Sequence, residues 1–344
     1  MAPRFAPSRR SLLKTSLIAG GLSAGGLVSI DALAQGKTRI NMQLGWITGI
    51  NQVGEVVAKR LGYYEQEGID FLIQPGGPNI DGVAIVASGK HQVGQVSSSP
   101  SIMLAVSQGL PIKCFAVGAQ KHPFTFFSLQ KNPVRKPADL VGKKVGLPST
   151  SVILLRALLA QNKIPEKDVI IVPVGADMSP LLTGQVDVVT GWLTSTTALK
   201  VLGSERVDMP LWDAGVRLYA LPYYATTETL QSKPKVIEAF LRATARGWYQ
   251  ARANRDQAVE LLVKEYPNLK AEDERVAIDV MLDYSFGGQA ATQGWGGMEP
   301  AVWQEQISMY SQLGQFTART PKVEEVITLD ALKATVAARS HSKA

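Results

Sequence analysis

The stretch INMQLGWITGINQVGEVVAKRLGYYEQEGID, from Ile40 to Asp70, decides the fold that we predict for this chain. Residues 39–44 alternate apolar and polar side chains, as a half-buried strand does. A short polar loop follows Trp46, and apolar residues then recur at helical spacing from Val53 to Leu61. The order of strand, loop and helix predicts an α/β fold.

The loop after Trp46 is the first candidate for a ligand site. In open α/β sheets a ligand binds beyond the carboxyl ends of the strands, where the next helix offers unpaired N–H groups. We therefore expect Trp46, Thr48, Asn51 and Gln52 to line a site rather than a core. Along the rest of the chain, short apolar runs alternate with helical patterns, which is typical of βαβ units.

The first residues predict export. Residues 8–14, SRRSLLK, are typical of a twin-arginine signal, and the small residues Ala32-Leu33-Ala34 predict cleavage after Ala34. The alternative is a transmembrane anchor, but the weakly apolar run at 15–30 is rich in glycine. It falls short of the ~20 strongly apolar residues that a membrane span needs. We expect a soluble periplasmic protein whose signal peptide, residues 1–34, has been removed.

Length, charge and cysteine content narrow the function classes. Removing 34 of 344 residues leaves 310, which is too many for one simple core and suits two lobes. The signal holds four of the 36 Lys and Arg and one of the 29 Asp and Glu, so the mature chain has 32 basic and 28 acidic residues, a net charge of +4. This modest excess without basic runs predicts no nucleic-acid partner. Cys114 is the single cysteine, so no internal disulfide can form, and we expect a buried, inert thiol.

The opening stretch also carries a family resemblance, in LGYYEQEGIDF at residues 61–71. Later matches, in order, are ASGK (87–90), QGLP (108–111), PADLVGKKVG (137–146), LTGQVD (182–187) and FLRAT (240–244). Over residues 39–329, these segments together resemble the periplasmic substrate-binding proteins of the nitrate, sulfonate, taurine and thiamine-precursor type. The resemblance implies a two-lobed periplasmic binding protein fold of type II, the Venus-flytrap arrangement, with a ligand cleft between the lobes.

The lobe limits follow from this resemblance and from the alternation of strands and helices. Lobe 1 is expected to combine residues 38–123 and 224–330, lobe 2 to cover 124–223, and a C-terminal tail to cover 331–344. The long helical patterns after Lys233 resemble those that return to the first lobe in this family. The chain should therefore cross twice between the lobes, near 120–125 and near 219–226. We expect a monomer.

Serine-rich segments and aromatic residues complete the predicted site. Ser97-Ser98-Ser99-Pro100 and Ser149-Thr150-Ser151 each follow a strand and precede a helix, where hydroxyls and free N–H groups can contact an anion. Helix capping alone would also explain the serines, and ordinary core packing would also explain the aromatic residues. The predicted ligand-binding residues are Trp46, Thr48, Asn51, Gln52, Ser98, Ser99, Ser149, Thr150, Ser151, Trp192 and Tyr219.

The sequence contains short patterns that resemble enzyme motifs, but their context does not fit catalysis. Residues 21–25, GLSAG, fit a nucleophile pattern, but they lie in the segment that is cleaved away and follow no strand. His91, His122 and His341 are scattered and have no cysteine partner nearby. We predict no catalytic residue, no metal and no cofactor. A periplasmic enzyme that uses the same cleft remains the alternative.

The resemblance implies delivery of a small organic solute to the permease and ATPase of an ABC importer, or its presentation to a membrane sensor. The solute is expected to be a sulfonate, a carboxylate or a heteroaromatic compound, with a thiamine-precursor amino-pyrimidine as the alternative. In the thiamine-precursor branch the residue before the tryptophan is usually acidic, whereas here it is Gly45. Losing that acceptor would leave N–H donors unpaired, at about 1–3 kcal/mol each. We therefore favour a planar or aromatic solute with an anionic or strongly polar group.

Overall fold

The computed structural model describes residues 36–77, 80–175 and 177–340. The predicted signal peptide and the last four residues of the predicted tail lie outside these ranges. Among the described helices, none is both long and apolar enough to cross a membrane.

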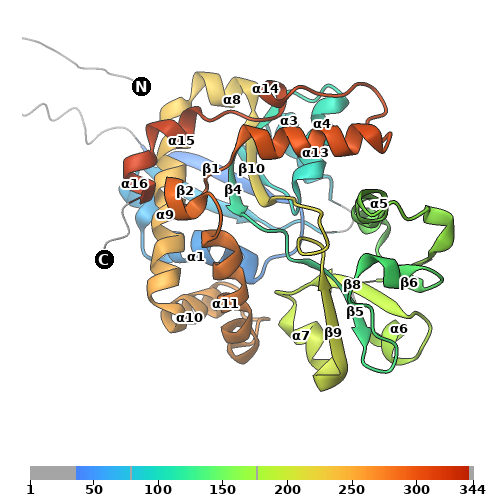
Figure 1. The fold of residues 1–344 in the computed structure, drawn as a ribbon. Coiled ribbons are helices and arrows are strands. Elements are labelled where there is room, and N and C mark those ends of the chain that lie inside the picture. The colour runs from blue at the N-terminus through green and yellow to red at the C-terminus, as the bar shows by residue number, and fades with distance from the viewer. Residues whose placement is uncertain (1–35, 78–79, 176, 341–344) are drawn as a thin grey trace, which may run out of the picture. The chain divides into compact units, whose positions relative to one another are not determined.

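The first sheet has five strands in the order β2-β1-β3-β10-β4. Its strands are β1 (Thr38–Leu44), β2 (Ile69–Gln74), β3 (Val93–Gln95), β4 (Ile112–Ala119) and β10 (Ala220–Thr226). The side chains of Ile40, Met42 and Leu44 are buried, as the alternation in the sequence predicts. β1 pairs in parallel with β2 and β3, whereas β10, yellow in Figure 1, runs antiparallel between β3 and β4.

The second sheet also has five strands, in the order β7-β6-β8-β5-β9. Its strands are β5 (Phe124–Leu129), β6 (Lys144–Leu147), β7 (Ile170–Pro173), β8 (Val188–Trp192) and β9 (Arg206–Pro210). The chain crosses between the sheets at residues 120–123 and at 211–219. Residues 220–223, which we assigned to the second lobe, belong instead to the first sheet, because β10 pairs there with β4 from Ala220 onward.

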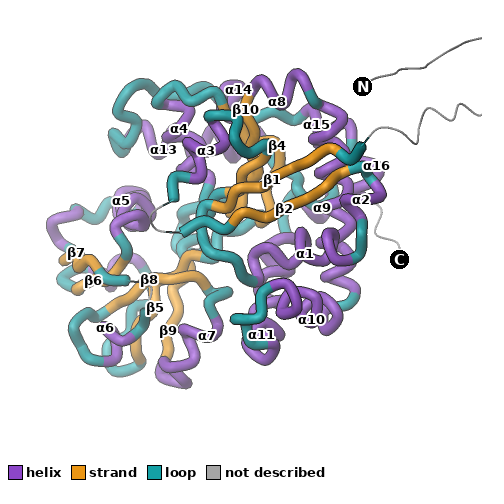
Figure 2. The backbone as a smooth tube through the Cα atoms, turned by 180° about the vertical axis from the view of Figure 1, so that it is seen from behind, coloured by secondary structure: helices purple, strands orange, loops and turns teal. Residues whose placement is uncertain are grey.

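Helices cover both sheets (Figures 1 and 2). Those before β5 are η2 (Ile50–Gln52), α1 (Val53–Arg60), α2 (Tyr63–Gln66), α3 (Gly82–Ala87) and α4 (Ser99–Ser107). Those of the middle part are η3 (Pro137–Leu140), η4 (Ser149–Ser151), α5 (Val152–Gln161), η5 (Glu166–Asp168), α6 (Ser179–Leu182), α7 (Thr196–Leu199) and η6 (Lys200–Glu205). Those after β10 are α8 (Thr227–Ser232), α9 (Pro234–Ala253), α10 (Arg255–Glu265), α11 (Ala271–Phe286), α12 (Ala290–Gln293), α13 (Pro300–Gln312), α14 (Val323–Val326), α15 (Asp330–Ala334) and α16 (Val336–Ser340).

Close packing of α1 against α9 fixes the start of the site loop. A Cβ atom on Gly247 of α9 would lie 2.0 Å from the backbone oxygen of Gly54, and one on Gly54 would lie 2.2 Å from the Trp248 ring. Such distances are far inside van der Waals contact, so both positions need glycine for the two helices to approach this closely. Because α1 follows directly after residues 45–52, its docking on α9 holds that loop in place.

The described end of the chain is part of the core rather than a loose tail. Arg339 of α16 is only 2% exposed. Its guanidinium donates to the carbonyl oxygens of Trp295 at 2.6 Å and of Leu332 at 2.8 Å. We expected residues 331–344 to form a tail, and this is wrong for the part up to Ser340. Arginine is usually exposed, so the sequence alone does not reveal a guanidinium that buried carbonyls satisfy.

Candidate ligand-binding site

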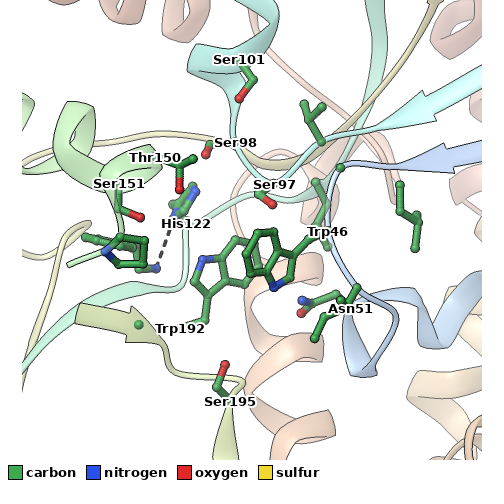
Figure 3. Close-up of a pocket in the computed structure, with 18 of the residues that line it drawn as sticks. Trp46, Asn51, Ser97, Ser98, Ser101, His122, Thr150, Ser151, Trp192 and Ser195 are labelled. Carbon is green, nitrogen blue, oxygen red and sulfur yellow. Dashed lines mark hydrogen bonds between the residues drawn. The ribbon is translucent and has the colours of Figure 1, made fainter. Parts of the chain in front are cut away.

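A cavity of about 530 Å³ is lined by residues of both sheets. They come from the loops after β1, β2 and β3, from the first crossing, from the start of α5 and from the end of β8 (Figure 3). This places the cavity beyond the carboxyl ends of parallel strands, where an α/β sheet is expected to bind a ligand. A volume of this size is within the range of small-molecule sites.

The loop after β1 contributes an exposed tryptophan and two amides. Trp46 is 39% exposed although it is large and aromatic, and its backbone oxygen accepts a hydrogen bond from the N–H of Gly76 at 2.9 Å. Asn51 and Gln52, two of the predicted ligand-binding residues, line the same cavity. The hydroxyl of Thr194, which follows β8, donates to Oδ1 of Asn51 at 3.3 Å. The loop is therefore tied both to its own sheet and to the segment after β8.

Both serine-rich segments reach the cavity, one from each sheet. Ser98 is the N-cap of α4, and its side chain makes no capping hydrogen bond. Thr150 and Ser151 lie where η4 passes into α5, and the side chain of Ser151, the N-cap of α5, makes no capping bond either. The hydroxyls of these residues are therefore free of a capping role. Figure 3 shows Ser98, Thr150 and Ser151 around one space, with Ser97 and Ser101 beside them.

The indoles of Trp46 and Trp192 both project into the cavity from different sheets (Figure 3). Trp192 ends β8, and its ring packs against that of His122 with centroids 5.2 Å apart and an interplanar angle of 67°. Indole faces stack well on planar ligands, at about 0.5–1.5 kcal/mol for each pair beyond the area that they bury.

Four predicted site residues do not line the cavity. Ser99 is the first residue of α4 rather than its cap, and it is fully buried. Tyr219 is also buried, since its ring packs 5.8 Å from that of Trp303 and its hydroxyl accepts a hydrogen bond from the Glu299 N–H. Thr48, in the loop after β1, and Ser149, the first residue of η4, lie outside the lining. Thr48, Ser99 and Ser149 are each next in the chain to a lining residue, and Tyr219 is two residues from the lining residue Leu221.

Six polar lining residues were missing from the prediction. They are Gln95, Ser97, Ser101, His122, Thr190 and Ser195. Ser97 belongs to the serine run that the sequence singled out, and Thr190 and Ser195 flank Trp192 in the chain. His122 lies in the segment where the first crossing was expected. That position was the one feature of the sequence that indicated a place near the cavity for this residue.

The described lining contains no Asp, Glu, Lys or Arg side chain. His122 is its one ionisable member of the usual acid-base types, and burial lowers the pKa of this imidazole to about 3. The ring is therefore neutral at physiological pH. Among the described residues, no group of three or more His, Cys, Asp and Glu is placed to hold a metal ion.

A hydrogen-bonded chain connects the cavity wall to an acid in the core. Gln52 donates through Nε2 to Oε1 of Gln95 at 2.8 Å, and Gln95 donates through Nε2 to Oε1 of Glu55 at 2.8 Å. The Tyr223 hydroxyl donates to the same carboxyl oxygen. Burial of Glu55 raises its pKa to about 7. These hydrogen bonds fix the orientation of the side-chain amides of Gln52 and Gln95.

Residues 50–258 match the protein family described as NMT1/THI5 like. The chain belongs to this family. This NMT1/THI5-like chain is 25% identical over 277 residues to the riboflavin-binding protein RibY of Chloroflexus aurantiacus, covering 77% of this chain and 78% of RibY. It is also 25% identical over 281 residues to the formylaminopyrimidine-binding protein of Halalkalibacterium halodurans, covering 78% of this chain and 83% of the relative.

A solved structure supports the fold of this NMT1/THI5-like protein. The periplasmic aliphatic sulphonate binding protein SsuA from Escherichia coli matches with a TM-score of 0.66 at 18% identity, over 87% of this chain and 100% of SsuA. The predicted two-lobed periplasmic binding protein fold is therefore confirmed, and so is the predicted family.

The relatives of this NMT1/THI5-like chain also include enzymes. The 4-amino-5-hydroxymethyl-2-methylpyrimidine phosphate synthase of Legionella pneumophila is 25% identical over 247 residues, covering 70% of this chain and 77% of that protein. Family membership alone therefore does not decide between a binding protein and an enzyme. The side chains that line the cavity are the evidence that bears on this choice.

Proposed function

We propose that this protein is the periplasmic solute-binding component of an ABC importer, which captures a planar heteroaromatic solute and delivers it to a membrane permease with its ATPase. The observation that carries this proposal is the cavity of about 530 Å³, with an indole from each sheet and no charged side chain in its described lining. A solute that contacts both lobes at once would favour the closed state of such a protein.

The uncharged lining favours a solute without strong charge. An ionic group taken from water into this site would meet hydroxyls, amides and backbone N–H groups, but no opposite full charge. A heteroaromatic body can instead rest on Trp46 or Trp192, while hydroxyl substituents contact the serine-rich segments. The relative named as a riboflavin-binding protein fits this class, because riboflavin joins a planar ring system to a hydroxylated chain.

A small sulfonate or carboxylate is the second candidate. It is favoured by the two serine-rich segments, since the start of α4 and the start of α5 both offer N–H groups to an anion. The amino-pyrimidine alternative has less support, because no carboxylate in the described lining could accept from its amino group.

Binding rather than turnover is the reading that the cavity chemistry supports. The thiol of Cys114 lies outside the lining and donates to the Ala116 carbonyl oxygen, and burial raises its pKa well above the usual range. Nδ1 of His122 is occupied by the backbone N–H of Phe124 at 3.2 Å. A thiol and an imidazole held in this way do not form a nucleophile and base pair. We infer that a bound compound leaves the protein unchanged.

Isothermal titration calorimetry with four probes tests the proposal. The probes are riboflavin, formylaminopyrimidine, taurine and ethanesulfonate. We expect riboflavin to bind most tightly, and Trp46→Ala and Trp192→Ala each to weaken it about tenfold, from lost stacking and buried area. Trp212→Ala is the control, since Trp212 lies outside the cavity lining. Tightest binding of ethanesulfonate would favour the second candidate, and conversion of any probe would contradict a binding-only role.

We also propose export by the twin-arginine route, supported by residues 8–14 and by the predicted cleavage after Ala34. Changing Arg9 and Arg10 together to lysine should leave the uncleaved precursor in the cytoplasm, as fractionation and immunoblotting would reveal. Normal processing of that double variant would contradict this route. The protein is proposed to act as a monomer.

A further inference from the structure

His122 occupies an unusual place, because it lies on the first crossing and also lines the cavity. The crossing, residues 120–123, joins β4 of the first sheet to β5 of the second. The imidazole is 1% exposed and packs edge-on against Trp192. Figure 3 shows the ring among Trp192, Thr150 and Ser98 of the cavity wall. This residue therefore belongs to the connection between the lobes and to the wall of the cavity between them.

The two nitrogens of this ring have different surroundings. Nδ1 accepts the Phe124 N–H at 3.2 Å, so in the neutral ring the hydrogen is on Nε2. Nε2 is buried and has no hydrogen-bond partner. Leaving a buried donor unpaired is energetically costly, which makes such a group rare without a function. Burial lowers the pKa of His122 to about 3, so the ring stays a neutral donor at any physiological pH.

A second unpaired group lies on the same wall. The hydroxyl of Thr190 is buried without a partner, and the residue lines the cavity. Thr190 and Trp192 are two residues apart in β8, so their side chains are on the same face of the sheet. Trp192 therefore has the unpaired hydroxyl of Thr190 on its own strand, and the imidazole of His122, with its unpaired Nε2–H, packs against its ring. A planar solute that stacks on this indole would present its polar edges to such groups.

We infer that His122 is a specificity-determining residue, which donates its Nε2–H to an acceptor atom in the plane of the bound aromatic solute. This rests on the proposed solute-binding function and narrows it to heteroaromatic solutes that carry a ring carbonyl or a pyridine-type ring nitrogen at one edge. The imidazole is packed against Trp192 and buried, so a side-chain shift on binding would bring Nε2–H to the solute, which is an ordinary change on binding. Because His122 lies on the crossing, the new bond also favours the bound arrangement of the two lobes.

A pair of variants separates the two ring nitrogens. The amide of glutamine reaches the position of Nε2, whereas that of asparagine reaches only the position of Nδ1. Titration calorimetry with riboflavin, which carries ring carbonyl acceptors, is the measurement. We expect His122→Asn to weaken binding about tenfold to a hundredfold, and His122→Gln to stay within about threefold of the wild type. Tyr310→Phe is the control, since it removes a buried, unpaired hydroxyl outside the cavity lining.

The outcomes distinguish this inference from the proposed function. Equal affinities in all three variants would overturn the role of His122 while leaving solute binding intact. Equal losses in His122→Asn and His122→Gln would also overturn it, because the imidazole would then act through its shape rather than through its N–H. If the wild type binds none of the four probes and no solute co-purifies with it, the proposed function fails and this inference fails with it.

Discussion

Glu55 is the residue whose surroundings depart most from what a carboxylate prefers. It lies on α1 in the core, fully buried, with Gln95 and Tyr223 donating to one of its oxygens. The hydroxyls of Tyr64 and Tyr266 also belong to its electrostatic neighbourhood. No basic side chain bonds to it among the described residues, so burial dominates and raises its pKa from 4.5 to about 7.

This shift predicts a stability that falls as the pH rises. Below pH 4.5 the carboxyl is protonated in the folded and the unfolded chain alike. Between pH 4.5 and about 7 the unfolded chain loses the proton first, so the free energy of unfolding decreases, by about 3 kcal/mol in total from this group. Glu55→Gln should flatten the curve of unfolding free energy against pH, measured by urea denaturation from pH 4.5 to 7.5.

Two variants control this measurement. Burial also raises the pKa of Glu274 to about 7, so Glu274→Gln should flatten the same curve in part. Glu228 is exposed, and Glu228→Gln serves as the matched substitution at the surface. If Glu55→Gln keeps the wild-type slope of unfolding free energy against pH, ionisation of the Glu55 carboxyl in the core does not lower the stability.

Some site residues could be predicted from the sequence, and others could not. Trp46, Thr150 and Ser151 follow strands and precede helices, so the rule for α/β sheets places them correctly. Tyr219 failed because its neighbours Trp303 and Glu299 come from distant parts of the chain. His122 was dismissed because the sequence shows which residues are nearby in the chain, but not which nitrogen is left unpaired.

Helices α7 and α11 connect the two halves of the cavity. α7 follows β8 of the second sheet, and α11 packs on β4 of the first. Lys200, directly after α7, forms an ion pair with the buried carboxylate of Asp273, and the Thr197 hydroxyl donates to the same carboxylate at 2.6 Å. Ser195 and Ala198, from the same segment, line the cavity. Contact between these helices therefore joins the two lobes beside the cavity.

Removing this contact should weaken binding without touching the solute. Asp273→Ala leaves the lining intact but removes the partner of Lys200 and Thr197, so the open arrangement gains in population. We expect riboflavin affinity to fall about fivefold, equivalent to about 1 kcal/mol. Asp256→Ala is the matched control, because it breaks the ion pair with Arg275 that joins α10 to α11 within the first lobe. Equal effects of the two variants in calorimetry would contradict a role in closure.

The elements themselves were predicted unevenly. Early strands and helices follow the periodicity of local side chains, and their type and order agree with the structure. The place of β10 could not be predicted, because it pairs with β3 and β4 across more than a hundred residues of chain. The helices at residues 331–340 were predicted as a tail. Their packing depends on hydrogen bonds from the Arg339 guanidinium to buried carbonyl oxygens, which the sequence does not reveal.

At the scale of the whole molecule, the two crossings predict a hinge motion. We expect the mature protein to become more compact when riboflavin saturates it, because solute contacts from both sheets favour the closed arrangement. Small-angle X-ray scattering should show a smaller radius of gyration with riboflavin than without it. The Trp192→Ala variant, at the same riboflavin concentration, serves as the control and should stay closer to the unliganded value. An unchanged radius in the saturated wild type would argue against closure.

The position of β10 between β3 and β4 in the first sheet sets an order for biogenesis. The five strands of the second sheet are continuous between Phe124 and Pro210, so that lobe is complete once this span has left the ribosome. The first sheet cannot be completed until residue 226 has been synthesised. The core beside it also includes Arg339, which is made later still. Since domains tend to fold as units during synthesis, the middle of this chain can fold before its beginning. Strands β1, β2 and β3 can pair with one another early, but the free edge of β3 waits for β10, so a chain that terminates early would carry one finished lobe and one open sheet edge.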